Sequence, residues 1–154
     1  TWFGRNQSNN DDDAITTILN SPDVVIGLSD AGAHVVREGG YGMLAFFLSH
    51  WVRDKQAMSL EEGVKRITST QAELFGIADR GKLEEGLAAD VLVVDVDGLS
   101  VGEPVEVHDL PGGSRRLKQV SQGIPYTIVN GEVLIEHGEH TGALPGKVLR
   151  GTHS

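Results

Sequence analysis

The sequence contains no cysteine among its 154 residues. Disulfides, thiolate nucleophiles and thiolate metal ligands are therefore excluded within this chain, and the absence fits a reducing compartment. Basic residues are also scarce, with 13 Lys and Arg against 22 Asp and Glu and a formal net charge of −9. A basic surface for phosphate backbones is not expected, so nucleic acid is not a predicted partner.

Long apolar runs are missing as well. The longest apolar stretch, MLAFFLSHWV, is too short and too interrupted to cross a membrane. The chain does not open with a charged and then apolar leader, so we expect no membrane partner and a cytoplasmic protein. Because the first residue is Thr1 rather than Met, we also expect a processed chain or a piece of a longer one.

The six histidines show no metal-binding pattern. They form neither an H-x-H pair nor an i, i+4 pair on a predicted helix. His137 and His140 are three residues apart in EHGEHTG, where Gly138 favours an exposed turn. The sequence therefore predicts no self-sufficient metal site in this chain.

The first half of the chain predicts an α/β arrangement. An acidic start at Asp11 predicts a helix to Asn20, and the apolar, β-branched run Val24–Leu28 is typical of a strand buried inside a parallel sheet. The sequence SLEE at residues 59–62 is a capping box that opens a helix ending at Gly76. Helical spacing also links a group of earlier apolar residues: Leu44, Phe47, Leu48, Trp51 and Val52. The helix that the capping box opens should turn a second group towards a core: Leu60, Val64, Ile67, Leu74 and Phe75.

The second half predicts antiparallel β structure. Glycine becomes frequent after Arg80, and ADVLVVDVDG gives an apolar strand that ends in a turn. Asn130-Gly131 lies between two β-rich runs, which is the strongest short-range signal for a hairpin. We therefore place a domain boundary between Gly76 and Gly86.

One carboxylate, Asp30, lies at the position where parallel α/β folds usually carry their catalytic residues. Asp30 follows the predicted strand, and side chains at the C-terminal ends of such strands enter the loop face. There it could move a proton from a metal-bound water or bind the metal itself. Alternatively, Asp30 caps the turn by accepting N–H groups from residues 31–33. His34 could face a substrate or simply lie on the loop.

Several segments together carry a family resemblance. GLSDAGAH, SLEEGVKRITSTQAELFGIADRGKLEEGLAADVLVVD, HDLPGGSRRL, IVNGEV and TGALPGKVLRG occur in this order. They closely resemble the C-terminal region of the amidohydrolase superfamily, in its N-acyl-D-amino-acid deacylase (D-aminoacylase) branch. The most specific segment is LFGIADRGKLEEGLAADVLVVD, which in such enzymes links the last barrel helix to the strands of a small β-sandwich.

The resemblance implies a fold and a reaction. Residues 1–78 would supply the last strand and helices of a TIM-like (β/α)8 barrel, and residues 79–154 part of the β-sandwich. One or two ions, usually zinc, would activate a water that attacks the amide of a small molecule such as an N-acyl-D-amino acid. Asp30 matches the general acid/base at the end of barrel strand 8, which sometimes also touches metal, and His34 would line the substrate pocket.

The metal-binding residues of the family are missing from this chain. The strand-1 H-x-H pair, the bridging residue and the histidines of strands 5 and 6 should all precede Asp30. We therefore expect a fragment that binds no zinc alone and that self-associates through exposed strand edges into a homo-oligomer. Two alternatives stay open: a non-catalytic β-rich scaffold or interaction module, and a small enzyme completed by histidines from another polypeptide.

Overall fold

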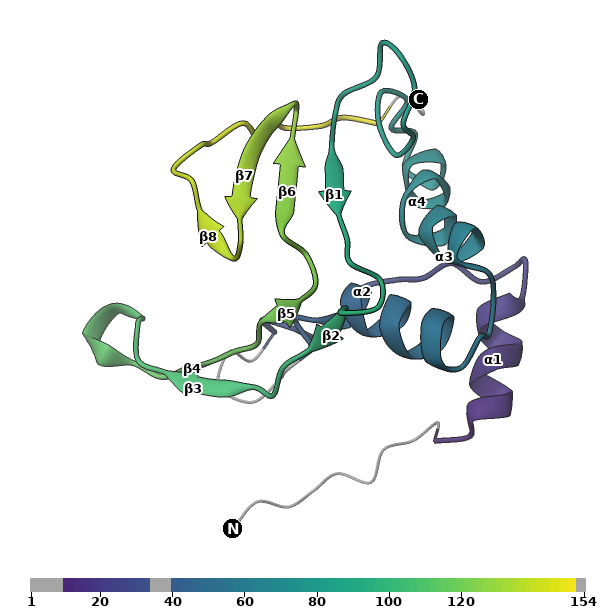
Figure 1. Cartoon of the computed structure of the whole chain (residues 1–154), viewed down its shortest axis with the longest axis horizontal. Helices are drawn as coiled ribbons and strands as arrows, with labels where there is room; N and C mark the ends of the chain where they lie inside the picture. Colours follow the sequence, from purple (N-terminus) through teal and green to yellow (C-terminus); the bar gives the residue numbers. More distant parts are fainter. Residues whose placement is uncertain (1–9, 34–39, 152–154) are drawn as a thin grey trace.

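The computed structural model describes residues 10–33 and 40–151 (Figure 1). The α-helices and the π-helix lie in the first half of the chain, and the strands lie in the second half together with one short 3₁₀ turn. The helices are α1 (Asp12–Asn20), α2 (Met43–Phe46), the π-helix η1 (Phe47–Asp54), α3 (Leu60–Ile67), α4 (Ser69–Leu74) and the 3₁₀ turn η2 (Pro111–Gly113). The strands are β1 (Val91–Val93), β2 (Ser100–Val101), β3 (Val105–Val107), β4 (Arg116–Lys118), β5 (Ser121–Gln122), β6 (Tyr126–Val129), β7 (Glu132–Glu136) and β8 (Glu139–His140).

The acidic N-terminal segment forms the predicted helix. The Asp11 carboxylate caps α1 by accepting the N–H groups of Asp13 and Ala14 at 3.0 and 3.1 Å. Asp12 and Asp13 then occupy the first turn, where the helix dipole favours negative charge. Asp12 also forms an ion pair with Lys55, which follows η1, so α1 is tied to that helix.

The parallel strand predicted at Val24–Leu28 is not formed among the described residues. Every strand pair of the described residues is antiparallel, and none includes this run. Instead, Gln71 of α4 donates a hydrogen bond to the Ile26 carbonyl, and Leu28 is 94% exposed. A buried strand needs neighbours for its N–H and C=O groups. The described residues supply no such neighbour for this apolar run.

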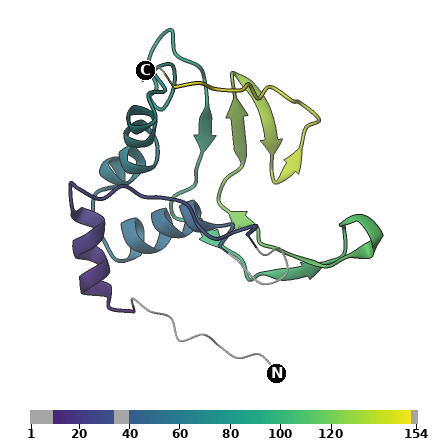
Figure 2. The ribbon, with the colours of Figure 1, turned by 180° about the vertical axis from the view of Figure 1, so that it is seen from behind.

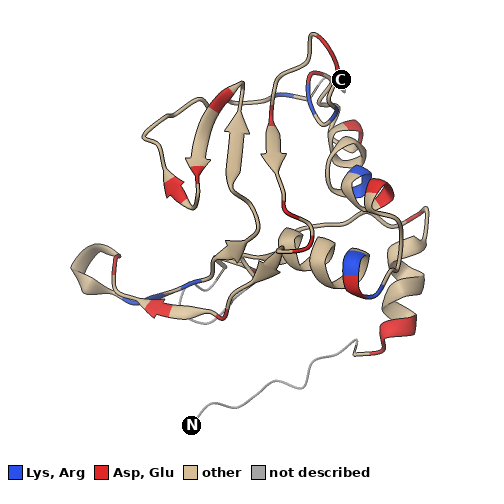
Figure 3. Cartoon of the chain, viewed as in Figure 1, with Lys and Arg blue, Asp and Glu red and all other residues tan. Residues whose placement is uncertain are grey.

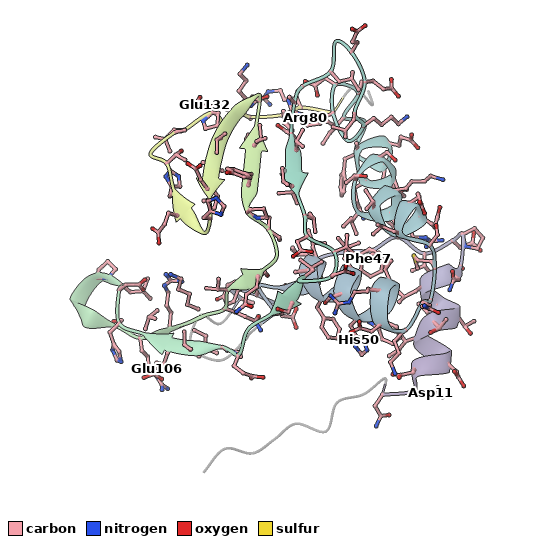
Figure 4. The ribbon with its side chains drawn as sticks, viewed as in Figure 1. Asp11, Phe47, His50, Arg80, Glu106 and Glu132 are labelled. Atoms are coloured by element: carbon pink, nitrogen blue, oxygen red, sulfur yellow. The ribbon has the colours of Figure 1, made fainter. Side chains whose placement is uncertain are left out.

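The helical spacing after Gly42 is confirmed, although much of this helix has π geometry. η1 ends with a bond from the Lys55 N–H to the His50 carbonyl at 2.8 Å, the i to i+5 pattern of a π-helix. Phe47 points inward (Figure 4) and is 4% exposed, and Val52 is 5% exposed. Elsewhere in residues 10–33 and 40–151, the buried apolar residues are Ala45, Ala72 and Leu99.

Ser59 caps the helix as predicted, since its hydroxyl accepts the Glu62 N–H at 3.2 Å. The Glu62 carboxylate pairs with Arg66 instead of completing the capping box. The helix that it opens is broken at Thr68 (φ −128°, ψ −90°) into α3 and α4, and Gly76 follows α4 with φ +65°. The predicted core face of this helix is largely uncovered, contrary to expectation. Its exposed fractions are 38% at Leu60, 41% at Val64, 54% at Leu74 and 64% at Phe75. The described part of the chain does not supply a surface that covers these side chains.

The second half is antiparallel β structure, as predicted. The largest sheet has the order β1-β6-β7-β8, and β2 pairs with β5 and β3 with β4. Asn130 (φ +48°) and Gly131 (φ +82°) join β6 to β7 in the expected two-residue hairpin, with Val129 opposite Glu132. Positive φ at both turn residues is the geometry that an Asn-Gly sequence favours.

Figures 1 and 2 show how the two halves are arranged. The four-stranded sheet stands beside α3 and α4, while the β3–β4 hairpin projects away from the remaining elements. This hairpin carries charges of both signs (Figure 3), with Arg115 paired to Glu106 and Arg116 to Asp109. Within the described residues, no helix combines the length and the apolar character that crossing a membrane requires.

Helix η1 also joins the two halves directly. Arg53 near its C-terminal end donates from Nη1 to the carbonyls of Val96, Asp97 and Leu99 at 2.9, 3.2 and 2.7 Å. These carbonyls belong to the loop between β1 and β2. Because a guanidinium can satisfy several acceptors at once, a single side chain fixes this loop against the helix.

Candidate functional site

Asp30 lies in a turn that its neighbours, rather than its own carboxylate, hold in place. The Ser29 hydroxyl accepts the Ala31 N–H at 3.3 Å, and the Asp30 main-chain carbonyl accepts the Ala33 N–H at 3.0 Å. Gly32 within this turn has φ +85°, a conformation that favours glycine. The alternative in which the Asp30 side chain caps this turn therefore does not apply, because the bonds that hold the turn use Ser29 and the Asp30 main chain.

The Asp30 side chain is exposed, and among the described residues it makes no hydrogen bond or ion pair. A carboxylate in this state can accept a proton or a ligand without first breaking an internal contact. The second predicted site residue, His34, lies outside the described residues.

The described residues do not form a metal centre around Asp30. Over residues 10–33 and 40–151, no three His, Cys, Asp or Glu side chains come together as a metal site would require. Asp30 by itself is one oxygen ligand, which does not hold zinc. Any metal at this position would need ligands from beyond the described part of this chain.

The histidine pair near the C-terminus is exposed, as predicted, with His137 in the turn before β8 and His140 in β8 itself. His137 (φ +48°) and His140 are both exposed. The His137 Nε2 is 3.2 Å from the Tyr126 hydroxyl, while the His140 Nδ1 accepts the Gly142 N–H at 2.9 Å. Each imidazole thus has a local partner and the two do not form a shared site.

Arg80 is the centre of the segment that carries the most specific resemblance. Its side chain is only 12% exposed and donates to both carboxylate oxygens of Asp79 at 3.1 Å (Figure 4). It also pairs with Asp90, whose other oxygen accepts the Asn130 N–H at 2.8 Å. The Asn130 side chain in turn donates to the Pro145 carbonyl at 2.7 Å. Arg80 therefore joins the end of the helical part to β1, to the β6–β7 turn and to the C-terminal segment.

A shallow pocket of roughly 400 Å³ lies beside Arg80. It is lined by Ile77, Ala78, Asp79, Arg80, Ala88, Asn130, Lys147, Val148, Leu149 and Arg150. Because Arg80 is already paired with two carboxylates, its charge is neutralised locally. Arg80 and its two carboxylate partners therefore form a structural junction at one side of this pocket.

The Arg80 junction predicts a pH-dependent stability. Hydrogen bonding from Arg80 holds the pKa of Asp79 below its ordinary value in the folded state. A depressed folded pKa gives stability that is present above the unfolded pKa of about 4 and is lost as pH falls through the folded pKa. We expect Arg80→Gln to lower Tm at pH 7, and this difference from the unsubstituted chain to shrink below about pH 4.

The control for this prediction is Arg115→Gln, which removes a more exposed pair with Glu106 on the β3–β4 hairpin. Exposed pairs contribute little, so this variant should change Tm less at pH 7. Thermal unfolding followed by circular dichroism between pH 3 and pH 7 provides the measurement. An Arg80→Gln effect of equal size at both ends of this range would contradict the prediction.

Comparison with known proteins shows which protein family the chain belongs to. The sequence profile of the amidohydrolase family matches residues 3–135. This match covers well over half of the chain, which therefore belongs to the amidohydrolase family.

Particular relatives narrow the resemblance to the deacylases of D-amino acids. The chain is 36% identical over 110 residues to N-acyl-D-aspartate deacylase of Alcaligenes xylosoxydans xylosoxydans, covering 71% of this chain and 20% of that protein. It is 31% identical over 110 residues to N-acyl-D-glutamate deacylase from the same organism, with the same coverage. The chain thus spans about a fifth of the length of these curated relatives.

Solved structures agree with this assignment. A crystal structure of D-aminoacylase matches with a TM-score of 0.52 and 29% identity, over 70% of this chain and 21% of that one. A second D-aminoacylase structure, from work on the functional role of that enzyme's binuclear metal centre, matches with the same TM-score and the same identity. The predicted resemblance to the D-aminoacylase branch is confirmed.

Sequence reasoning did not single out the polar residues that hold the Asp30 region in place. Gln71 and Gln119 both bond to main-chain groups of this region, at Ile26 and Gly42 respectively. Neither lies in a motif with recognisable spacing, and each contact joins positions more than 40 residues apart.

Proposed function

We propose that this chain is the C-terminal part of a metal-dependent amidohydrolase that cleaves the amide bond of an N-acyl-D-amino acid, with Asp30 as its general acid/base. The observation that carries the proposal is the Asp30 carboxylate, exposed and without a partner among the described residues, in a chain of the amidohydrolase family. The names of the relatives support the substrate class, since they are deacylases of N-acyl-D-aspartate and N-acyl-D-glutamate.

The role assigned to Asp30 is proton transfer. Its carboxylate accepts a proton from the water that attacks the amide carbonyl, and it returns this proton to the nitrogen as the carbon–nitrogen bond breaks. The products are a carboxylic acid and a free amine, so the carboxylate ends each turnover as it began. When bound, zinc would lower the pKa of the attacking water. Its ligands would come from the rest of the TIM-like barrel, to which residues 1–78 would contribute the last strand and helices.

A non-catalytic scaffold or interaction module is the second candidate. It is motivated by the lack of a three-ligand cluster among the described residues. The two candidates differ in what lies before Thr1. Only a catalytic protein requires an upstream H-x-H strand and further histidines.

The test begins with the gene upstream of Thr1. We expect an open reading frame that encodes the H-x-H pair, and we would purify both its complete product and this 154-residue chain. The complete product should contain stoichiometric zinc and hydrolyse N-acetyl-D-aspartate, N-acetyl-D-glutamate or N-acetyl-D-methionine, while the chain alone should do neither. Metal content and amine release provide the measurements. An in-frame stop immediately before Thr1, or zinc and turnover in the short chain, would contradict the proposal.

A further inference from the structure

The β half of the chain contacts the segment that follows Asp30 at Gly42, just before α2. The Gly42 N–H donates to Oε1 of Gln119 at 3.3 Å, and Nε2 of the same side chain donates to the Gly102 carbonyl at 3.0 Å. Gly102 is itself held, because its N–H donates to the Val120 carbonyl at 2.9 Å. The Gln119 side chain therefore bridges Gly42 to the β2–β5 ribbon.

Gly42 also lies directly on a side chain of this ribbon. A Cβ atom at position 42 would be 2.4 Å from Cγ1 of Val101 and 2.9 Å from Cγ2, distances shorter than real side chains allow. The φ of Gly42 is −86°, which any residue adopts. Glycine is thus required here by the neighbouring Val101 and not by the backbone conformation.

From Gly42 the contact continues to the residue before Asp30. Gly40 accepts the Met43 N–H at 3.1 Å in the turn that precedes α2. Its own Cα lies against Ser29, since a Cβ at position 40 would be 3.4 Å from the Ser29 Cβ. Ser29 accepts the Ala31 N–H and so holds the turn that contains Asp30. Packed and hydrogen-bonded residues thus join Gln119 to Asp30.

We propose that Gln119 is a positioning residue of the hydrolytic site, which sets the place of the Asp30 carboxylate through Gly42, Gly40 and Ser29, with Gly42 packed closely against Val101. The inference rests on the proposed function and adds a role for the β half in catalysis. A proton-transfer group must lie within about 2.6–3.2 Å of its target, and a 1 Å displacement can lower the rate about 100-fold. A contact that fixes the turn around Asp30 can therefore control the rate without touching the substrate.

The first experiment uses the clash at Gly42 and its relief, in the complete enzyme. Gly42→Ala should reduce kcat by about 10-fold or more while KM changes less than about threefold, since the displaced group is Asp30. Adding Val101→Ala removes both methyl groups that the new Cβ meets, and kcat should recover to within about threefold of the unsubstituted enzyme. Val105→Ala, at a half-exposed valine of the neighbouring β3, is the matched control for the second substitution and should not rescue.

The second experiment does not depend on activity. In this 154-residue chain, Gln119→Ala should accelerate amide hydrogen exchange in peptides that cover residues 29–33 and 42–46. Gln122→Ala removes an exposed side chain of the same type three residues away and should leave this exchange unchanged. Exchange in the β6–β7 hairpin serves as the internal reference, because it lies outside the proposed path.

The outcomes separate the two proposals. Full activity and unchanged exchange in Gly42→Ala and Gln119→Ala would overturn the positioning role while leaving the hydrolytic function intact. An unsubstituted complete protein without hydrolytic activity would overturn the function, and the exchange data would still decide whether Gln119 holds the Asp30 turn. A loss of kcat in Gly42→Ala that Val101→Ala does not relieve would also count against the proposed path.

Discussion

Replacing Asp30 with asparagine is expected to lower kcat for N-acyl-D-amino acid hydrolysis by about 10²- to 10⁴-fold in the complete enzyme, the usual contribution of a general acid/base. Asparagine has nearly the same shape but cannot take up a proton from water or give one to the leaving nitrogen. The substitution breaks no contact that the described residues make with the Asp30 carboxylate, so Tm should change little. Steady-state kinetics with amine detection, together with thermal unfolding, provides the measurement.

Asp23→Asn is the matched control for this prediction. Asp23 is also exposed and lies seven residues earlier, before the Val24–Leu28 run, so the same chemical change there should leave kcat unaltered. Zinc content measured in both variants separates two roles of Asp30. Retained zinc with lost turnover indicates proton transfer, and lost zinc indicates a ligand. An Asp30→Asn enzyme with near-normal kcat would contradict the role assigned to this carboxylate.

Leu99→Ala is expected to lower the free energy of unfolding by about 2–5 kcal/mol, the range for buried leucines that leave a cavity. Leu99 is only 1% exposed and is the most buried large side chain of the described residues. Its main-chain carbonyl accepts a hydrogen bond from Arg53, so the residue lies where helix η1 meets the β half. Urea unfolding of the 154-residue chain, followed by circular dichroism and analysed for midpoint and slope, tests this expectation.

Leu83→Ala provides the control, since this leucine is 80% exposed and its truncation should change stability by less than about 0.5 kcal/mol. An equal effect of the two substitutions would show that Leu99 is not part of a packed core. A change in the slope of the unfolding curve, rather than in its midpoint alone, would indicate that the helical and β halves no longer unfold together.

Features that depend on neighbouring residues in the sequence could be predicted well. The helix with the acidic start at Asp11, the cap at Ser59 and the Asn130-Gly131 hairpin each use contacts within a few residues, and each is present. The Val24–Leu28 run was predicted to form a strand because its residues favour β structure. Strand formation also needs hydrogen-bonding neighbours, and the described residues supply none.

The same distinction between local and long-range contacts applies to the candidate site. Asp30 could be selected from the sequence because it follows an apolar run and lies in a family-like segment. The contacts around it could not, because Gln119 reaches Gly42 across 77 residues and has no distinctive local pattern. Similarly, the sequence identified an apolar face on the helix that forms α3 and α4. Whether this face is buried depends on other elements packing against it, and the described residues leave it largely exposed.

The large separation between Gly42 and Gln119 has a consequence for how the protein folds. A hairpin closed by two residues, such as β6–β7, forms in about 1–10 μs, whereas contacts between distant residues must first overcome the entropy of closing a long loop. We therefore expect the hairpins to form early and the Gly42–Gln119 contact late. The orientation of Asp30 would then be among the last features acquired during folding, so an enzyme that has refolded its secondary structure could still be inactive for a time.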